Sequence, residues 1–129
     1  MKSFFQGEEM GLLNNMDISY EDTVDVRGIQ CGPEKYLTPE CSRDPQRTPL
    51  QWSADANAGF TGAGVTPWLP LRADYVSDNI EAQAAADESH LKVYQALTAM
   101  RSNANVMEGD VNISAVGTVF AFNRYRPFH

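Results

Sequence analysis

The clearest hydrophobic pattern of the chain lies between Glu88 and Ser102. Large apolar side chains recur there at every third residue, namely Leu91, Tyr94, Leu97 and Met100. Side chains at this spacing fall on one face of an α-helix, and Asp87 or Ser89 supplies a capping oxygen at its start. The pattern predicts an amphipathic helix over residues 88–102.

A period of two residues replaces this spacing near the end of the chain. Val111 and Ile113, and then Val119 and Ala121, alternate with other residues on either side of Gly117. Alternation of this kind is typical of strands, and a glycine between two such runs marks a turn. We expect two antiparallel strands, followed by an aromatic tail over residues 122–128. One helix and one hairpin bury little surface, so these elements are expected to be only marginally stable.

The region from Leu12 to Ala73 has neither period. It holds most of the proline and glycine of the chain, and it follows a block at residues 4–6 that is typical of the end of a strand. Loops longer than about 12–15 residues are uncommon unless they form a lid or a site. The segment is predicted to be a long loop with short turns, and a functional site is sought there first.

Composition narrows the class of protein. The 129 residues are 43% hydrophobic and 21% charged, which is typical of a single globular domain. Ten Lys and Arg against seventeen Asp and Glu leave a formal charge of -7, which disfavours binding to nucleic acid. No run approaches the roughly 20 apolar residues that cross a bilayer, and the first residues contain no signal-peptide core. We expect neither a nucleic-acid partner nor a membrane segment in this chain.

Two cysteines, Cys31 and Cys41, flank a loop that contains proline. In an oxidising compartment they can form a short disulfide, and in a reducing one they remain free thiols. Two cysteines without clustered histidine are too few for a zinc site with four ligands. The sequence therefore predicts no metal site and no cofactor.

The densest group of functional side chains is Ser42-Arg43-Asp44-Pro45-Gln46-Arg47-Thr48-Pro49-Leu50-Gln51-Trp52. The prolines stiffen this loop, and the fixed fork of an arginine suits vicinal sugar hydroxyls or a carboxylate. On composition alone, the preferred interpretation is an ordinary surface ion pair among Arg43, Asp44 and Arg47, worth about 0–1 kcal/mol.

The order of these residues changes that interpretation. The segment resembles the Ser-Arg-Asp-Pro-x-Arg-Thr-Pro-hydrophobic-Gln-Trp sequence of maltases, isomaltases and oligo-1,6-glucosidases in the alpha-amylase family of glycoside hydrolases. The resemblance covers nearly the whole chain until about Asn123, and the stretch from Ile18 to Asp25 looks most like insect maltases. The other matching stretches are residues 6–11, 57–61, 67–70 and 89–94.

The resemblance implies an α/β fold, the last βα portion of a (β/α)8 barrel. Residues 4–6 would end the eighth strand, a long loop would run from Gly7 to about Ala86, and the predicted helix would be the eighth barrel helix. Residues 1–106 would then belong to the catalytic barrel, and residues 107–129 would begin a small antiparallel β domain. On this view the fold of the chain is incomplete.

The same resemblance implies an α-glucosidase that releases terminal α-linked glucose, with retention, from maltose, sucrose and other short α-glucosides. The segments that carry the family's nucleophile, acid and assisting aspartate have no counterpart here. The chain alone is therefore expected to be inactive, and no catalytic residue is assigned. Two sets of neighbouring carboxylates, Glu8 with Glu9 and Asp22 with Asp25, are interpreted as parts of a charged loop.

Arg43 is the one substrate-binding residue that the resemblance assigns. It matches a family arginine that reaches the glucose in the reacting subsite and orients it without attacking it. Asp44 and Arg47 match the same motif and are expected to have structural roles. Trp52 and Trp68 are interpreted as packed anchors of the loop, since a tryptophan beside proline is more often part of a core.

Asn112-Ile113-Ser114 fits the acceptor pattern for N-glycosylation. It agrees with an extracellular, gut-lumen or membrane-associated location, which the resemblance implies for the parent enzyme. Cys41 replaces an aromatic or aliphatic residue found in many relatives, and with Cys31 it would tie the loop locally. His90 and His129 stand apart from any serine or cysteine nucleophile pattern and are interpreted as bystanders.

Two other classes of protein stay open. One is the ectodomain of an amino-acid transporter heavy chain, which shares the barrel without the glycosidase chemistry, and the intact arginine motif argues against it. The other is an independent binding module that uses the long loop, for which the sequence offers only Arg43 and the aromatic side chains. An open part of a barrel exposes apolar faces, which favours aggregation over specific binding.

Overall fold

A computed structural model describes residues 6–126 of the chain. Its contacts divide the chain into two compact units, residues 1–91 and residues 92–129. The predicted boundary between residues 106 and 107 concerns the domains of the complete fold and stays a prediction. No helix within the described part of the chain is long and apolar enough to cross a membrane.

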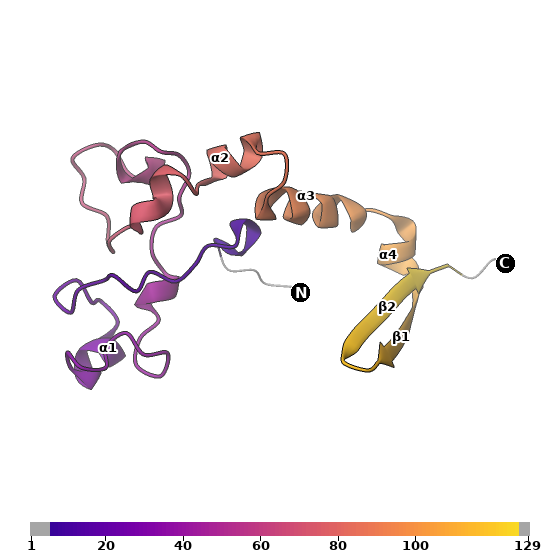
Figure 1. Cartoon of the computed structure of the whole chain (residues 1–129), viewed down its shortest axis with the longest axis horizontal. Helices are drawn as coiled ribbons and strands as arrows, with labels where there is room; N and C mark the ends of the chain where they lie inside the picture. The colour runs from indigo at the N-terminus through magenta and orange to yellow at the C-terminus, as the bar shows by residue number, and fades with distance from the viewer. Residues whose placement is uncertain (1–5, 127–129) are drawn as a thin grey trace. The chain divides into compact units, whose positions relative to one another are not determined.

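The predicted helix and hairpin are both present (Figure 1). Helix α3 runs over His90–Met100. Strands β1, Asp110–Val116, and β2, Val119–Tyr125, pair antiparallel in a two-stranded sheet. They are joined by a two-residue turn in which Gly117 has a φ of 61°, a left-handed conformation that glycine adopts without a steric penalty. The expected aromatic tail begins inside β2, and the part of it beyond Arg126 lies outside the described residues.

The described part of the chain contains three short helices that its sequence pattern did not predict. Helix α1 spans Val26–Cys31, helix α2 spans Ile80–Ala85, and helix α4 spans Ala104–Glu108 in the second unit. Each begins at an Asp or Asn whose side chain accepts a hydrogen bond from a peptide N–H of the first turn, namely Asp25, Asn79 and Asn103. Four short 3-10 turns complete the first unit: Glu8–Met10, Asp44–Gln46, Ala56–Gly59 and Ala73–Val76. Of the predicted strand end at residues 4–6, only Gln6 lies within the described residues, where it is part of a turn.

The first unit has a small core built from widely separated segments. Its buried apolar side chains include Met10, Ile18, Leu50, Leu69 and Leu91. Gln83 of α2 joins the beginning and the end of this unit. Its amide nitrogen donates to the carbonyl oxygen of Met10 at 2.9 Å, and its amide oxygen accepts from the N–H of Leu91 at 3.0 Å. Because the first N–H groups of a helix have no partner within the helix, Gln83 helps to cap α3. Capping by Asp87 or Ser89 stays a prediction.

The hairpin of the second unit has one apolar face. The register places Val111, Ile113 and Ala115 opposite Arg124, Phe122 and Phe120. Opposite residues of an antiparallel pair lie on the same face, and the large apolar side chains here are all exposed. This agrees with the expectation that helix and hairpin bury little surface, because no apolar residue of residues 92–126 is buried.

Candidate functional site

The arginine motif folds as an anchored loop with one open side. Six of its eleven residues are buried, namely Ser42, Asp44, Pro45, Pro49, Leu50 and Gln51. Arg43, Gln46 and Arg47 are exposed. These three residues lie in or next to the 3-10 turn Asp44–Gln46, whose second residue is Pro45. They are three and four residues apart, so their side chains point to the same side of the turn. The motif thus separates residues that hold the loop from residues that face outward.

Asp44 belongs to the residues that hold the loop. It is 2% exposed, and its Oδ2 atom accepts from the peptide N–H groups of Val24 and Asp25, each at 2.9 Å. The hydroxyl of Ser42 accepts in turn from the N–H of Asp44 at 3.1 Å. These contacts give Asp44 a structural role. They also differ from the surface ion pair among Arg43, Asp44 and Arg47 that composition alone favoured.

Arg43 pairs instead with Asp25, which is 18 residues away in the sequence. Both the peptide N–H and the Nε atom of Arg43 donate to Oδ2 of Asp25, each at 3.1 Å. The side chain of Asp25 is 6% exposed, whereas that of Arg43 is 58% exposed. The peptide N–H of Arg43, then its guanidinium and then the N–H of Arg27 hold the pKa of Asp25 below its ordinary value, since all three favour the ionised carboxylate.

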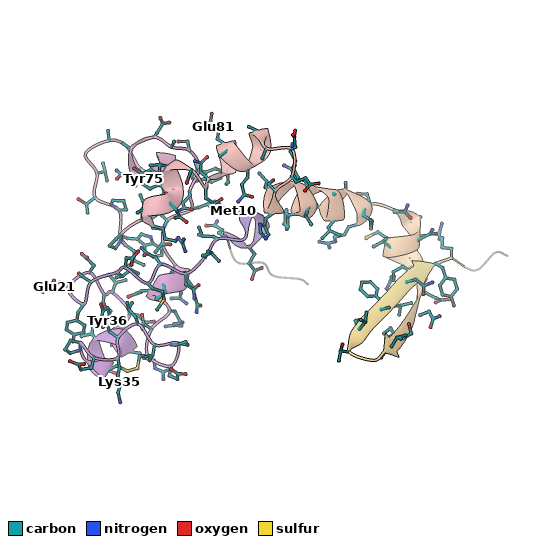
Figure 2. All side chains as sticks on the ribbon, in the orientation of Figure 1. Met10, Glu21, Lys35, Tyr36, Tyr75 and Glu81 are labelled. Carbon is teal, nitrogen blue, oxygen red and sulfur yellow. A yellow bond between two sulfur atoms is a disulfide. The ribbon has the colours of Figure 1, made fainter. Side chains whose placement is uncertain are left out.

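Cys31 and Cys41 form a disulfide with a Cα–Cα distance of 6.1 Å. It joins the last residue of α1 to the residue two before Arg43. The loop between the cysteines is held by Tyr36, which lies beside α1 in Figure 2 and whose hydroxyl donates to the carbonyl oxygen of Ile18 at 2.9 Å. The ring of Tyr36 also contacts that of Tyr20 edge to face, at a centroid distance of 5.4 Å. The segment before Arg43 is therefore fixed by a disulfide, and the loop between the two cysteines by a hydrogen bond and an aromatic contact of Tyr36.

Three hollows open around the exposed arginines. The first, of about 280 Å³, is lined by Arg43, Gln46, Arg47 and the Gln6–Glu8 and Leu12–Asn14 segments. The second, of about 360 Å³, places Arg47 beside the aromatic rings of Phe60 and Trp68. The third, of about 320 Å³, lies between the Asp25–Arg43 pair, Arg47 and Trp68. Arg47 lines all three hollows, which the sequence did not predict, although its spacing from Arg43 was a usable signal.

The two tryptophans are more open than expected. Trp52 is 49% exposed and Trp68 is 60% exposed. The interpretation of both as packed anchors does not hold among the described residues, because neither ring is enclosed. Trp68 lines the second and third hollows together with Arg47.

Three of the four neighbouring carboxylates, those of Glu9, Asp22 and Asp25, have local partners. Glu9 accepts from the peptide N–H of Gly7 at 2.9 Å, and Asp22 accepts from the hydroxyl of Ser19 at 2.7 Å. Asp25 is occupied by Arg43 and Arg27. The interpretation of these groups as parts of a charged loop agrees with this geometry. No three His, Cys, Asp or Glu side chains gather as metal ligands within residues 6–126.

The remaining candidates lie away from the arginine loop. His90 is the first residue of α3, and its ring packs on the turn at Gly11, where an added Cβ would lie 3.0 Å from the ring. His129 lies outside the described residues. Asn112 is exposed in β1 and pairs with Asn123, on the face of the hairpin that also carries Ser114.

Comparison with known proteins identifies the family. Residues 1–110 match the alpha amylase catalytic domain. The chain is 40% identical over 121 residues to Maltase 1 of Drosophila virilis, a match that covers 93% of this chain and 19% of that protein. It is 42% identical over 113 residues to the salivary alpha-glucosidase of Anopheles gambiae, covering 88% of this chain and 18% of that protein. The chain spans about a fifth of the length of the curated relatives that it matches.

Solved structures agree with this result. The trehalulose synthase of Pseudomonas mesoacidophila matches with 28% identity and a TM-score of 0.76, over 95% of this chain and 24% of that one. An alpha-glucosyl transfer enzyme matches with 31% identity and a TM-score of 0.74, over 95% of this chain and 22% of that one. Both are barrel enzymes of the same family, so the predicted fold class, part of a (β/α)8 barrel, is confirmed. The chain belongs to the alpha-amylase family of glycoside hydrolases, and most of it is catalytic domain.

Proposed function

We propose that this chain is part of an α-glucosidase that hydrolyses terminal α-linked glucose from di- and oligosaccharides, with retention, in carbohydrate metabolism. The names of the relatives, maltase and salivary alpha-glucosidase, support this class of reaction. The observation that carries the proposal is the pair of exposed guanidinium groups, Arg43 and Arg47, which share a hollow on a loop held in place by buried residues such as Asp44.

Such a hollow suits a neutral sugar. The fork of an arginine donates to two neighbouring hydroxyls in one geometry, and the rings of Phe60 and Trp68 beside Arg47 offer apolar faces for a pyranose. In this proposal Arg43 orients the reacting glucose and Arg47 contacts the same sugar or the next one. Retaining hydrolysis also needs two carboxylates about 5–5.5 Å apart, and none is assigned to the described residues, where Glu9, Asp22 and Asp25 have local structural partners. These residues would therefore orient substrate and would not cleave it.

The test is hydrolysis of maltose and sucrose by the polypeptide expressed from the natural transcript. Arg43→Lys keeps the charge and loses the fork, so we expect kcat/KM to fall by about a hundredfold. Arg101→Lys, at an exposed position after α3, is the matched control and should keep full activity. The 129-residue chain expressed alone should release no glucose. A natural polypeptide that hydrolyses no α-glucoside would instead favour the transporter heavy chain.

We propose further that the protein is an extracellular glycoprotein with an N-glycan on Asn112. The disulfide between Cys31 and Cys41 supports an oxidising compartment, and the name of the salivary relatives supports secretion. Asn112 and Ser114 are both exposed and lie on the face of the hairpin opposite Ile113, Phe120 and Phe122. The test is the shift in mass after enzymatic removal of N-glycans from protein secreted by insect cells. Asn112→Gln should abolish the shift, and Asn123→Gln, on the directly opposite residue, should leave it unchanged.

A further inference from the structure

The carboxylate of Asp25 gathers three N–H donors. Its Oδ1 atom accepts from the peptide N–H of Arg27 at 3.1 Å and thereby caps helix α1. Its Oδ2 atom accepts from the peptide N–H and from the Nε atom of Arg43. One side chain therefore fixes the start of a helix, the backbone of the motif loop and the guanidinium plane of Arg43 together.

The arrangement leaves the far end of the guanidinium open. Within residues 6–126, Nε is the only side-chain nitrogen of Arg43 that hydrogen-bonds to a protein group. The side chain is 58% exposed and lines the first hollow beside Arg47. Because a guanidinium is planar, fixing Nε and the backbone N–H restricts the directions in which the two terminal nitrogens can donate.

The segment that carries Asp25 makes three further contacts with the arginine motif and the residue before it. Asp44 accepts from the peptide N–H groups of Val24 and Asp25, so the two segments exchange carboxylate-to-amide hydrogen bonds. The disulfide between Cys31 and Cys41 joins the other end of α1 to the motif. Gly28 of α1 lies so close to Ser42 that an added Cβ would be 3.2 Å from the Cβ of that residue.

We propose that Asp25 is a positioning residue, which fixes the direction in which the guanidinium of Arg43 faces the hollow that it shares with Arg47. The inference rests on the proposed sugar-binding role of Arg43. An ordinary surface ion pair would not have this effect, because two flexible side chains in water hold no fixed geometry. Here the carboxylate is 6% exposed and bonds both the backbone and the side chain of the same arginine.

Asp25→Asn is the sharpest variant. Asparagine caps a helix about as well as aspartate, so α1 is retained, but its amide nitrogen cannot accept the two N–H groups of Arg43. Asp22→Asn is the matched control, since Asp22 lies on the same loop and bonds Ser19 instead. Should Asp25→Asn fail to fold, Asp25→Ser serves the same purpose, because serine also caps a helix and is too short to reach Arg43.

The first readout does not depend on activity. The natural polypeptide is treated with 2,3-butanedione, which modifies arginine, and labelling of the Arg43 peptide is followed by mass spectrometry with the exposed Arg101 as an internal reference. Loss of the Asp25 contact should raise the labelling rate of Arg43 several-fold, and Asp22→Asn should leave it unchanged. A wild-type labelling rate in Asp25→Asn overturns the proposal.

The second readout is a double-mutant cycle on maltose hydrolysis. Asp25→Asn should lower kcat/KM by about tenfold in the wild-type background and should have no further effect in Arg43→Ala, because the two residues act through one contact. Equal effects in both backgrounds would mean that Asp25 supports only the general fold, which overturns the proposal. If Arg43→Ala keeps full activity, its sugar-binding role fails and the positioning role fails with it. If Arg43→Ala is impaired while the Asp25→Asn variant keeps its kcat/KM, only the positioning role fails.

Discussion

The carboxylate of Asp44 accepts a hydrogen bond from the peptide N–H of Asp25 at 2.9 Å, while the carboxylate of Asp25 accepts one from the peptide N–H of Arg43 at 3.1 Å. Two loop segments about twenty residues apart are thus joined in both directions by charged acceptors. Hydrogen bonds to an ionised group are roughly twice as strong as neutral ones. The acidic residue of the motif therefore shapes the loop, and the basic residues are left to face outward.

Replacing Asp44 by Ala should destabilise the protein. The peptide N–H groups of Val24 and Asp25 would lose their acceptor in a buried place, and such a loss costs about 1–3 kcal/mol. We expect a lower midpoint of urea unfolding for the natural polypeptide. Asp55→Ala is a suitable comparison, because Asp55 is exposed and its carboxylate bonds only the hydroxyl of Ser53. Equal midpoints for the two variants would contradict the structural role of Asp44.

Gly28→Ala should also destabilise the protein, although replacing glycine by alanine in a helix usually stabilises it. Alanine normally stabilises a helix by about 1 kcal/mol relative to glycine. At Gly28 the added Cβ would lie 2.9 Å from the Cγ2 atom of Thr23, which is too close, and overpacking of this kind costs about 1–3 kcal/mol. Thr23→Ser removes that methyl group and keeps the hydroxyl that donates to the carbonyl oxygen of Ser19. The double variant should therefore unfold at a higher urea concentration than Gly28→Ala alone, and an unchanged midpoint would show that the contact is not the cause.

The elements predicted from the sequence are those with a long local period. Helix α3 and the hairpin repeat their apolar residues often enough to be recognised. Helices α1, α2 and α4 have five or six residues, fewer than two turns, so no period emerges. Their capping residues, Asp25, Asn79 and Asn103, were visible in the sequence, but an Asp or Asn in a loop is equally typical of a turn.

The site was predicted less completely than the fold. The family resemblance assigned Arg43 as a substrate-binding residue. Which of its neighbours are buried and which are exposed depends on how the loop folds, so it could not be predicted from the sequence. Asp25 lies 18 residues before Arg43, and no rule of helix or strand spacing connects them. Arg47 and Trp68 were assigned structural roles because isolated motifs do not indicate exposure, whereas both line the hollows. Contacts between residues far apart in the sequence could not be predicted from the sequence alone.

Stability should decrease in acid because of the Arg72–Asp74 pair. Hydrogen bonds from the guanidinium of Arg72 hold the pKa of Asp74 below its ordinary value of 3.8, although partial burial opposes them, and the pKa of Arg72 is raised in turn. A carboxyl whose folded pKa is lowered stabilises the folded state above its unfolded pKa. That stabilisation is lost as the pH falls through the folded pKa. Arg72 also donates to the carbonyl oxygen of Asn14, so this pair secures a wall of the first hollow.

The measurement is thermal unfolding of the natural polypeptide from about pH 2.5 to pH 7. Asp74→Asn should lower the melting temperature at neutral pH and have progressively less effect towards the acid end, because the wild-type carboxyl is then protonated as well. Glu40→Gln, which removes a carboxylate at an exposed position, should leave the profile of the wild type unchanged. A constant difference between Asp74→Asn and the wild type at every pH would contradict the role of its ionisation.

Gln83→Leu should loosen the start of helix α3. The side chain of Gln83 donates to Met10 and Asp78 and accepts from the N–H of Leu91, and leucine preserves its approximate volume without any of these bonds. The N–H of Leu91 belongs to the unsatisfied first turn of the helix, so loss of its acceptor should make its amide hydrogen exchange about tenfold faster.

Gln83→Glu keeps an acceptor for Leu91 but brings a second carboxylate to Asp78. It should therefore speed up hydrogen exchange around Met10 and Asp78 more than at Leu91. Hydrogen exchange followed by mass spectrometry resolves these segments, with Gln95→Leu on the exposed side of α3 as the control for the change in composition. If exchange is unchanged in both Gln83 variants, packing of Leu91 alone holds the start of α3, and the hydrogen bonds of Gln83 contribute nothing to it.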